Sequence, residues 1–242
     1  MTEASIEQIT ANLASVRSRM AAACERAGRS PDEVRLLPVS KTFGSDTVRA
    51  AHAVGIRLLG ENKVQEVQQK YRETHEELPD LEWAVIGHLQ TNKAKVVAQL
   101  ASEFQALDSL RLAAELDKRL RNADRSLTVL VQVNSSGEES KYGLDPEQVP
   151  AFAEEIAQYD RLRVSGLMTL AVNSPDLTMV AENFTVMTEL QERLRSSGAP
   201  GTWDDLSMGM SNDFELAIEH GATTVRVGTA IFGTRPGPDV WW

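Results

Sequence analysis

The sequence predicts an α/β protein with a single (β/α)8 TIM barrel and an extra helix in front of it. Eight short apolar runs follow one another along the chain, and nearly all the segments between them are long enough to hold a helix. Runs such as Leu127–Val133 are almost continuously apolar, which is typical of strands buried on both faces of a parallel sheet. Eight strands alternating with helices in 242 residues fit a closed barrel.

The first element is a leading helix within residues 1–30, and Gly28 is suited to end it. Its apolar residues recur at steps of three and four positions, which indicates one buried face. They are Ile6, Ile9, Leu13, Val16, Met20 and Ala27.

The barrel is expected over residues 34–233, followed by a tail at 234–242. Its strands are expected at 34–39, 56–59, 83–86, 104–107, 127–133, 162–168, 206–208 and 224–227. A doubly wound open sheet is the competing fold, but it usually has fewer strands and often a glycine-rich first turn. Here the first strand ends in VSKT at 39–42. No Pro/Gly linker divides the chain, so we expect one domain over residues 1–242.

Two helices between the strands carry clear periodic patterns. One runs through Leu177 to Leu194, and the other joins Val64, Val67, Tyr71 and Leu78. Helix-start signals lie at Asp145-Pro146, with Gln148 placed for a capping box, and again at Ser174-Pro175-Asp176. Helix ends are expected at Gly198 and Gly221.

Composition limits the class of protein. Lys and Arg number 25 against 35 Asp and Glu, a net charge of −10 that disfavours binding to nucleic acid or an anionic membrane surface. The single Cys24 has no partner for an internal disulfide, and the histidines lack metal-ligand spacing. The N-terminus lacks the pattern of a signal peptide, and no stretch is apolar for about 20 residues. We therefore expect a soluble cytoplasmic protein with no metal site.

Two loops at the end of the barrel favour an anion. In a barrel the functional residues lie where strands end at their carboxyl side. Ser207–Asn212 and Gly228–Gly233 follow the last two strands and offer backbone N–H groups, hydroxyls and helix starts. Barrel enzymes often bind phosphate at this place. The alternative is that these small residues only form tight turns.

Two basic residues at strand ends also suggest chemistry. Lys41 follows the first strand, where a desolvated amine could form a Schiff base with an aldehyde; the alternative is an ordinary solvated lysine. Arg226 lies within the apolar run 224–227, so its guanidinium is expected to be inside the protein with an acceptor. That acceptor could be an acidic side chain or an atom of a ligand.

Seven segments together resemble the YggS-like pyridoxal phosphate homeostasis proteins. They span residues 39 to 233 in order, and their combination is highly specific. They are VSKT at 39–42, GEN at 60–62 followed by VQE at 64–66, IGHLQTNK at 86–93, SKYG at 140–143, GLM at 166–168, LSMGMS at 206–211 and VRVGTAIFG at 225–233. One departure is Lys63, where the family often has Tyr or another residue.

The resemblance implies an alanine racemase-like barrel (fold type III) that carries pyridoxal 5′-phosphate (PLP) as a covalent internal aldimine on Lys41. It places Asn62 near the ring, Arg226 at the pyridine nitrogen, and the phosphate on the loops that end the last two strands. The cofactor-binding residues it implies are Lys41, Asn62, Met168, Ser207, Met208, Ser211, Arg226, Gly228 and Thr229.

The function implied is the buffering of PLP inside the cell and its delivery to PLP-dependent apoenzymes, with little or no catalytic turnover. Related racemases carry a β-rich second domain that supplies a Tyr base, and this chain ends soon after its eighth strand, so we expect no catalytic residue and a monomer. The alternatives are an amino-acid racemase of the alanine racemase type with Lys41 as its only base, and a Schiff-base aldolase that binds a phosphorylated sugar without PLP. Roles for Lys63, Lys141 and the tail residues Trp241 and Trp242 do not follow from the pattern.

Overall fold

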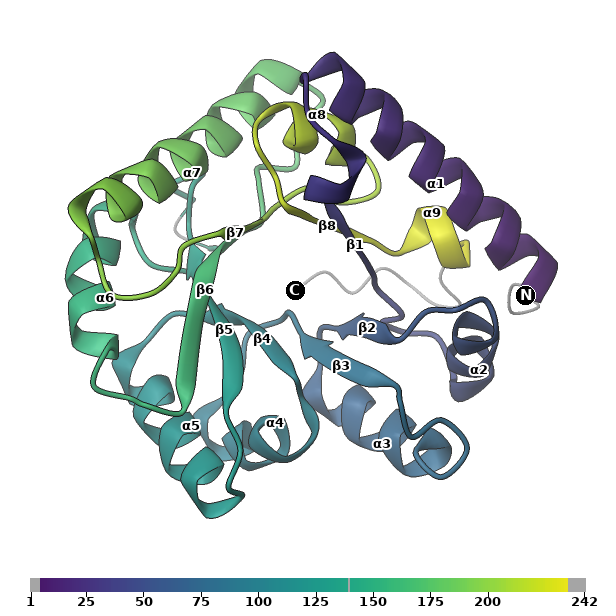
Figure 1. Cartoon of the computed structure of the whole chain (residues 1–242), viewed down its shortest axis with the longest axis horizontal. Helices are drawn as coiled ribbons and strands as arrows, with labels where there is room; N and C mark the ends of the chain where they lie inside the picture. Colours follow the sequence, from purple (N-terminus) through teal and green to yellow (C-terminus); the bar gives the residue numbers. More distant parts are fainter. Residues whose placement is uncertain (1–4, 139, 235–242) are drawn as a thin grey trace.

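The structure, a computed structural model that describes residues 5–138 and 140–234, contains the expected barrel. Its strands form one eight-stranded parallel sheet in the order β1-β8-β7-β6-β5-β4-β3-β2. Figure 1 shows them as a ring with the helices outside it. The strands are β1 Arg35–Pro38, β2 Leu58–Glu61, β3 Glu82–Val85, β4 Glu103–Leu107, β5 Leu127–Val133, β6 Leu162–Thr169, β7 Asp205–Ser207 and β8 Thr224–Val227.

The barrel closes between β1 and β2. Val39, just after β1, pairs with Gly60 of β2 in an isolated parallel bridge, and the Ser40 N–H donates to the Gly60 carbonyl at 3.1 Å. A Cβ on Gly60 would lie 3.1 Å from the side chain of Val39, so a larger residue would crowd this seam. The short bridge therefore sets the start of the loop that carries Lys41.

Helices follow the strands and cover the outside of the barrel. They are α1 Ile6–Arg26, α2 Ser45–Ala53, α3 Val64–Thr74, α4 Ala94–Leu100, α5 Leu110–Asn122, α6 Val149–Ile156, α7 Leu177–Ser197, α8 Phe214–Glu219 and α9 Thr229–Phe232. Short 3₁₀ helices occupy Pro31–Glu33, Thr91–Lys93 and Pro146–Gln148. In the described part of the chain, no helix is both long and apolar enough to cross a membrane.

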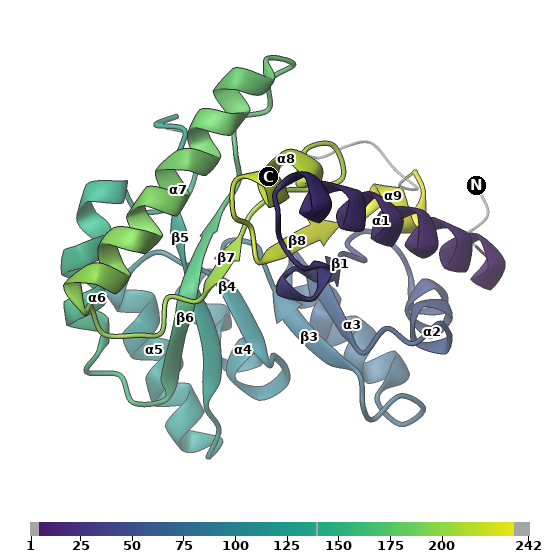
Figure 2. The same cartoon turned by 45° about the horizontal axis from the view of Figure 1, so that its top comes forward.

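The leading helix α1 lies against the helices that follow the last two strands, as Figures 1 and 2 show. Its Asn12 amide donates to the Ile231 carbonyl of α9 at 2.8 Å, and Arg19 forms a two-pronged ion pair with Glu215 of α8. Asn12 and Arg19 are half-buried and lie beside the apolar, buried face of the helix. Helix α1 thus contacts α8, which follows the first predicted anion-binding loop, and α9, which lies within the second.

Most local predictions are confirmed. All eight strands overlap the predicted apolar runs, although β2, at Leu58–Glu61, lies two residues later than predicted, and Asp145 and Gln148 form the predicted capping box. Gly198 ends α7 in the left-handed conformation, and Gly221, with φ of +93°, follows α8.

Two helix boundaries were predicted wrongly. The Ser174 hydroxyl accepts from the Asp176 N–H, so Asp176 becomes the N-cap of α7 and Pro175 precedes the helix. Helix α3 ends at Thr74, four residues before Leu78, whose N–H donates to the Thr74 carbonyl in the turn that follows. Of the predicted tail 234–242, only residue 234 is among the described residues.

Candidate functional site

The predicted cofactor residues come from strands whose carboxyl ends meet at one rim of the barrel. Lys41 lies just beyond β1, Asn62 directly follows β2, and Met168 lies near the end of β6. Ser207 ends β7, and Met208 and Ser211 lie in the loop after it. The last three lie in or just after β8: Arg226, Gly228 and Thr229. The parallel topology therefore gathers residues that are far apart in the sequence.

The backbone around Lys41 is sharply turned. Thr42 has φ of +70°, in the left-handed region that a β-branched residue rarely adopts, at a cost of about 1–3 kcal/mol. The Phe43 N–H closes the turn on the Ser40 carbonyl at 3.1 Å. Beyond the turn, the buried Phe43 ring packs on Phe232 of α9 with 5.8 Å between centroids. The Lys41 loop is thus in contact with the helix that follows β8.

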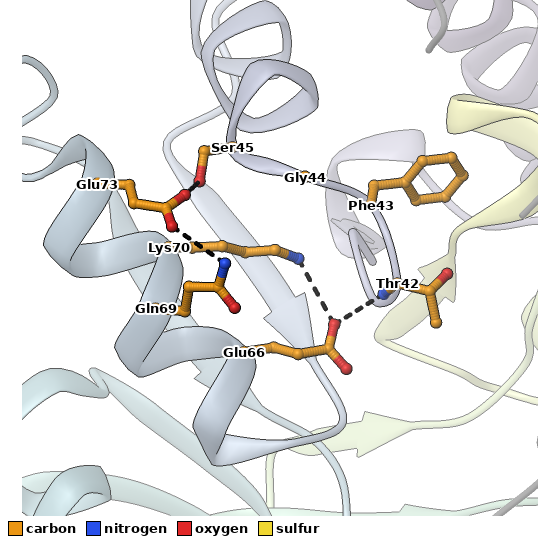
Figure 3. Close-up of a pocket in the computed structure, with 8 residues that line it drawn as sticks. All are labelled: Thr42, Phe43, Gly44, Ser45, Glu66, Gln69, Lys70 and Glu73. Atoms are coloured by element: carbon orange, nitrogen blue, oxygen red, sulfur yellow. Dashed lines mark hydrogen bonds and ion pairs between the residues drawn. The ribbon is translucent and has the colours of Figure 1, made fainter. Parts of the chain in front are cut away.

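Two side chains of helix α3 hold this turn. The Thr42 N–H donates to Glu66 at 2.7 Å, and the Lys70 ammonium donates to the Ser40 carbonyl at 2.8 Å. In Figure 3, Thr42 and Lys70 approach the Glu66 carboxylate from two sides. The peptide groups on either side of Lys41 are therefore both fixed by the same helix.

A buried ion pair lies beneath the turn. The Lys70 ammonium is 2.5 Å from Glu61 Oε1, which also accepts from the Ser40 hydroxyl at 2.6 Å. Both charged side chains are almost completely buried, and Oε2 of Glu61 has no hydrogen-bond partner. Burial raises the pKa of Glu61 to about 7, because the loss of water outweighs the opposing effects of Lys70 and Ser40.

A cavity of about 300 Å³ lies on the outer side of the turn, between α2 and α3. Its lining is Thr42, Phe43, Gly44, Ser45, Glu66, Gln69, Lys70 and Glu73. None of the predicted cofactor residues lines it, so it is distinct from the barrel rim where those residues gather. Within it Glu73 binds the Ser45 hydroxyl and accepts from Gln69, away from the backbone of the turn.

The two small-residue loops lie together, as predicted. The Arg226 N–H donates to the Gly209 carbonyl at 3.0 Å, and the Ser211 hydroxyl lies 3.5 Å from the Ala230 N–H. Thr229, at the start of α9, is exposed, and Gly228 passes so close to the residue after β1 that a Cβ would lie 3.0 Å from the Val39 carbonyl. Hydroxyls and the first N–H groups of α9 form a small polar corner suited to an anion.

Arg226 is buried, as the sequence predicted, and its acceptors are neutral. Its guanidinium donates to the Ser207 hydroxyl at 2.7 Å and to the Thr169 carbonyl at 2.6 Å. Burial lowers its pKa to about 10, with Asp213 acting in the opposite direction, so the group stays charged at neutral pH. A buried cation bonded to neutral oxygens leaves positive charge that a bound anion or ring acceptor would stabilise.

Ser207 and Met208 are bound within the barrel wall. The Ser207 hydroxyl donates to Gln105 at 2.7 Å while accepting from Arg226, and the Met208 N–H donates to the Thr224 carbonyl at 3.1 Å. Gln105 is oriented by Glu103, which in turn receives two hydrogen bonds from Arg35. This polar chain crosses the barrel interior and ends at Arg226.

Asn62 and Met168 lie at different depths. Asn62 is half-buried, and the segment that follows β3 lies so close to its backbone that a Cβ on Gly87 would be 2.3 Å from the Asn62 carbonyl oxygen. Met168 is completely buried. Lys63, where the sequence departs from the family pattern, is exposed at the start of α3.

Further residues occupy the rim near β3 to β5. The His88 and Tyr142 rings stack with 3.9 Å between centroids, and His88 Nδ1 is 3.6 Å from Asp108. Lys141 pairs with Glu138 and donates to the Ala171 carbonyl at 3.1 Å. Lys141 therefore has one partner in its own loop and one in the segment that follows β6.

Lys70 is the feature that the sequence analysis missed. The buried face of α3 is Val64, Val67, Lys70 and Thr74, at the spacing of a helical stripe. A lysine inside an apolar stripe requires a buried carboxylate. The helical spacing of Val64, Val67 and Lys70 could have revealed the buried lysine. The prediction placed Tyr71 on the buried face in place of Lys70.

Comparison with known proteins adds independent findings. The family model for the alanine racemase N-terminal domain matches residues 7–236. A pyridoxal phosphate homeostasis protein of Pseudomonas aeruginosa is 42% identical over 227 residues, covering 94% of this chain and 96% of that protein. PipY of Synechococcus elongatus PCC7942 with PLP bound superposes with a TM-score of 0.81 at 33% identity, covering 93% of this chain and 100% of PipY. Alanine racemase of Streptomyces coelicolor A3(2) shares the fold, with a TM-score of 0.67, 21% identity and coverage of 94% of this chain and 60% of that one.

Proposed function

Since the chain belongs to the family of pyridoxal phosphate homeostasis proteins, we propose that it binds PLP and buffers it for PLP-dependent enzymes, with little or no catalytic turnover. When bound, PLP supplies a reactive aldehyde and an electron-withdrawing pyridine ring. A relative named for PLP homeostasis and the PLP-bound PipY structure support this function. The arrangement of three parts of the rim supports it further.

The first part is Lys41. Its amine would hold PLP by a C=N bond to the aldehyde carbon, with the aldehyde oxygen released as water. The position of Lys41 at the end of β1, on a turn held from both sides, supports this role. Asn62, which follows the neighbouring strand, borders the ring.

The second part is the polar corner after β7 and β8. Backbone N–H groups at Gly228 and Thr229 and the hydroxyls of Ser211 and Thr229 bind the phosphate, which carries close to two negative charges near neutral pH. The proximity of Ser211 to α9 supports a shared anion site. Ser207 and Met208 fix the base of this corner through their bonds to the barrel wall.

The third part is Arg226, whose position carries the proposal. A guanidinium only donates, so facing the pyridine nitrogen it leaves that nitrogen unprotonated and the ring a weak electron sink. Its neutral acceptors and nearly complete burial support a further acceptor from a bound group. Met168, whose register partner in the sheet is Ser207, is the proposed cofactor residue of β6. A site of this kind holds PLP without activating it strongly.

The test is an absorbance titration of the full-length protein with PLP, before and after borohydride. We expect a near-visible band that differs from free PLP and that borohydride abolishes. Lys41→Ala should bind PLP without this band. A band of the same position and amplitude in Lys41→Ala would contradict the assignment of Lys41, and an aldolase without PLP would give no band in the wild type.

Delivery is tested with a PLP-dependent apoenzyme. We propose that the protein acts in the cytoplasm as a monomer and releases PLP to such apoenzymes. The PLP-loaded protein, separated from unbound PLP, should restore the activity of an apoenzyme, and light scattering should give the mass of one chain. An apoenzyme that stays inactive after prolonged mixing would contradict the delivery role.

A further inference from the structure

The turn that carries Lys41 is fixed at both of its peptide groups by a single helix. The carbonyl before Lys41 accepts from Lys70, and the N–H after it donates to Glu66. Lys70 and Glu66 are one helical turn apart on α3, with 3.7 Å between the ammonium and the carboxylate. The isolated bridge from Val39 to Gly60 joins the ends of β1 and β2 at the same seam.

The strain at Thr42 indicates that this fixation is specific. A β-branched residue with φ of +70° would relax to an extended conformation unless its surroundings held it. Relaxation would turn the Thr42 N–H away from Glu66 and rotate the adjoining Lys41. The Glu66 carboxylate and the Lys70 ammonium therefore oppose a movement that would displace the lysine.

The buried ion pair of Lys70 and Glu61 also indicates that the fixation of the turn is specific. Burying Lys70 and Glu61 is costly, and two well-packed apolar residues would fill the space at lower cost. What apolar residues could not do is donate to the Ser40 carbonyl or orient the Ser40 hydroxyl. The charges are thus retained where they hold the residue that precedes Lys41.

We propose that Lys70 and Glu66 are positioning residues that set the place of Lys41 for bonding to the PLP aldehyde, with Glu61 holding Lys70 in register. This inference rests on the proposed function. It assigns Lys70, Glu66 and Glu61 no contact with PLP itself. Their removal should impair bonding to Lys41 and leave the phosphate and ring contacts intact.

Two compounds separate these effects. PLP can bond to Lys41, whereas pyridoxine 5′-phosphate carries an alcohol in place of the aldehyde and cannot. We would measure the rate of borohydride-trapped labelling of Lys41 by PLP, with peptide mapping, and the Kd of pyridoxine 5′-phosphate for the same variants. The variants are Lys70→Met and Glu66→Ala in the full chain, with thermal unfolding as a check on the fold.

We expect both variants to label Lys41 about tenfold more slowly, as for a misplaced reacting group. Their Kd for pyridoxine 5′-phosphate should stay within about twofold of the wild type, as for sites not in contact. Glu66→Gln, which keeps an acceptor for the Thr42 N–H, should restore most of the rate. Glu73→Ala, on the same helix and cavity but bonded to Ser45, is the matched control and should label at the wild-type rate.

The outcomes are distinct. Wild-type labelling rates in Lys70→Met and Glu66→Ala would overturn the positioning role and leave PLP binding intact. Equal losses of labelling rate and of pyridoxine 5′-phosphate affinity would also overturn it, in favour of a purely structural role. A wild type that binds neither compound would instead overturn the proposed function.

Discussion

At the scale of single residues, two buried groups differ in how far their pKa lies from neutral pH. Arg226 keeps its charge, because a pKa of about 10 lies well above neutral pH. Glu61, by contrast, has its pKa raised to about 7 by burial, within the range where cellular pH varies. The stability of the folded protein should therefore depend on pH through Glu61, which lies beneath the turn that carries Lys41.

The sign of this dependence follows from the direction of the shift. A carboxyl whose pKa is higher in the folded state than in the unfolded state favours folding at low pH and loses that contribution as pH rises to about 7. Glu61→Gln removes the titration. Between pH 5 and pH 8, the wild-type Tm should fall more, or rise less, than the Tm of Glu61→Gln. Parallel Tm curves for the two proteins would show that Glu61 does not titrate in this window.

Thr229 provides a test of the phosphate corner. Thr229→Val keeps the shape of the side chain and removes the hydroxyl, so PLP binding should weaken by about 1–3 kcal/mol if that hydroxyl binds the charged phosphate. Isothermal titration gives the Kd. Thr10→Val, which removes an exposed hydroxyl bonded within α1, is the control. Unchanged PLP affinity in both Thr229→Val and Ser207→Ala would exclude this corner as the phosphate site.

At the scale of elements, periodicity predicted the strands well and the helix boundaries less well. Most strands are apolar runs with polar flanks, so their positions follow from the sequence. The start of α7 depends on whether Ser174 or Asp176 caps it, a competition between two similar side chains that only the folded geometry decides. Glu61, the partner of Lys70, lies on β2, so the spacing of residues within α3 alone does not predict this ion pair.

The loop between β7 and α8 depends on one glycine. Gly209 has φ of +89°, and a Cβ there would lie 2.6 Å from the Ala217 Cβ and 2.9 Å from the Phe214 Cα. Gly209→Ala should therefore lower the free energy of unfolding by about 2–6 kcal/mol through strain and overlap. Gly28→Ala, with φ of +66° and open space around it, should cost about 1 kcal/mol. Urea unfolding of both variants measures the difference, and equal losses would contradict the close packing of α8 on this loop.

At the scale of the whole molecule, the barrel was predictable because its strands and helices alternate regularly. The cofactor residues could be proposed because seven short segments match a family pattern over nearly the whole chain. The bonds of Lys70 to Ser40 and Glu61 could not be predicted from the sequence. They depend on closure between β1 and β2 and on the direction of α3 across that seam. Distances of this kind arise only when the sheet is closed.

The whole site also predicts weak chemistry. If Arg226 faces the pyridine nitrogen of bound PLP, as proposed, the ring would withdraw little negative charge from Cα of a bound amino acid. We expect turnover with alanine and other proteinogenic amino acids far below about 1 s⁻¹, despite full occupancy by PLP. Deuterium exchange at Cα, followed by chiral analysis, measures it. Turnover at or above that rate would favour the amino-acid racemase over the buffering protein, whereas slow exchange without inversion would be compatible with a lone Lys41.

The central claim is that PLP bonds to Lys41, and the most direct test is to locate the bond. The full-length protein is loaded with PLP and reduced with borohydride, and its peptides are mapped by mass spectrometry. The account predicts that the pyridoxyl group is found on the peptide that contains Lys41. A pyridoxyl group found mainly on Lys63, Lys93 or Lys141 would contradict it.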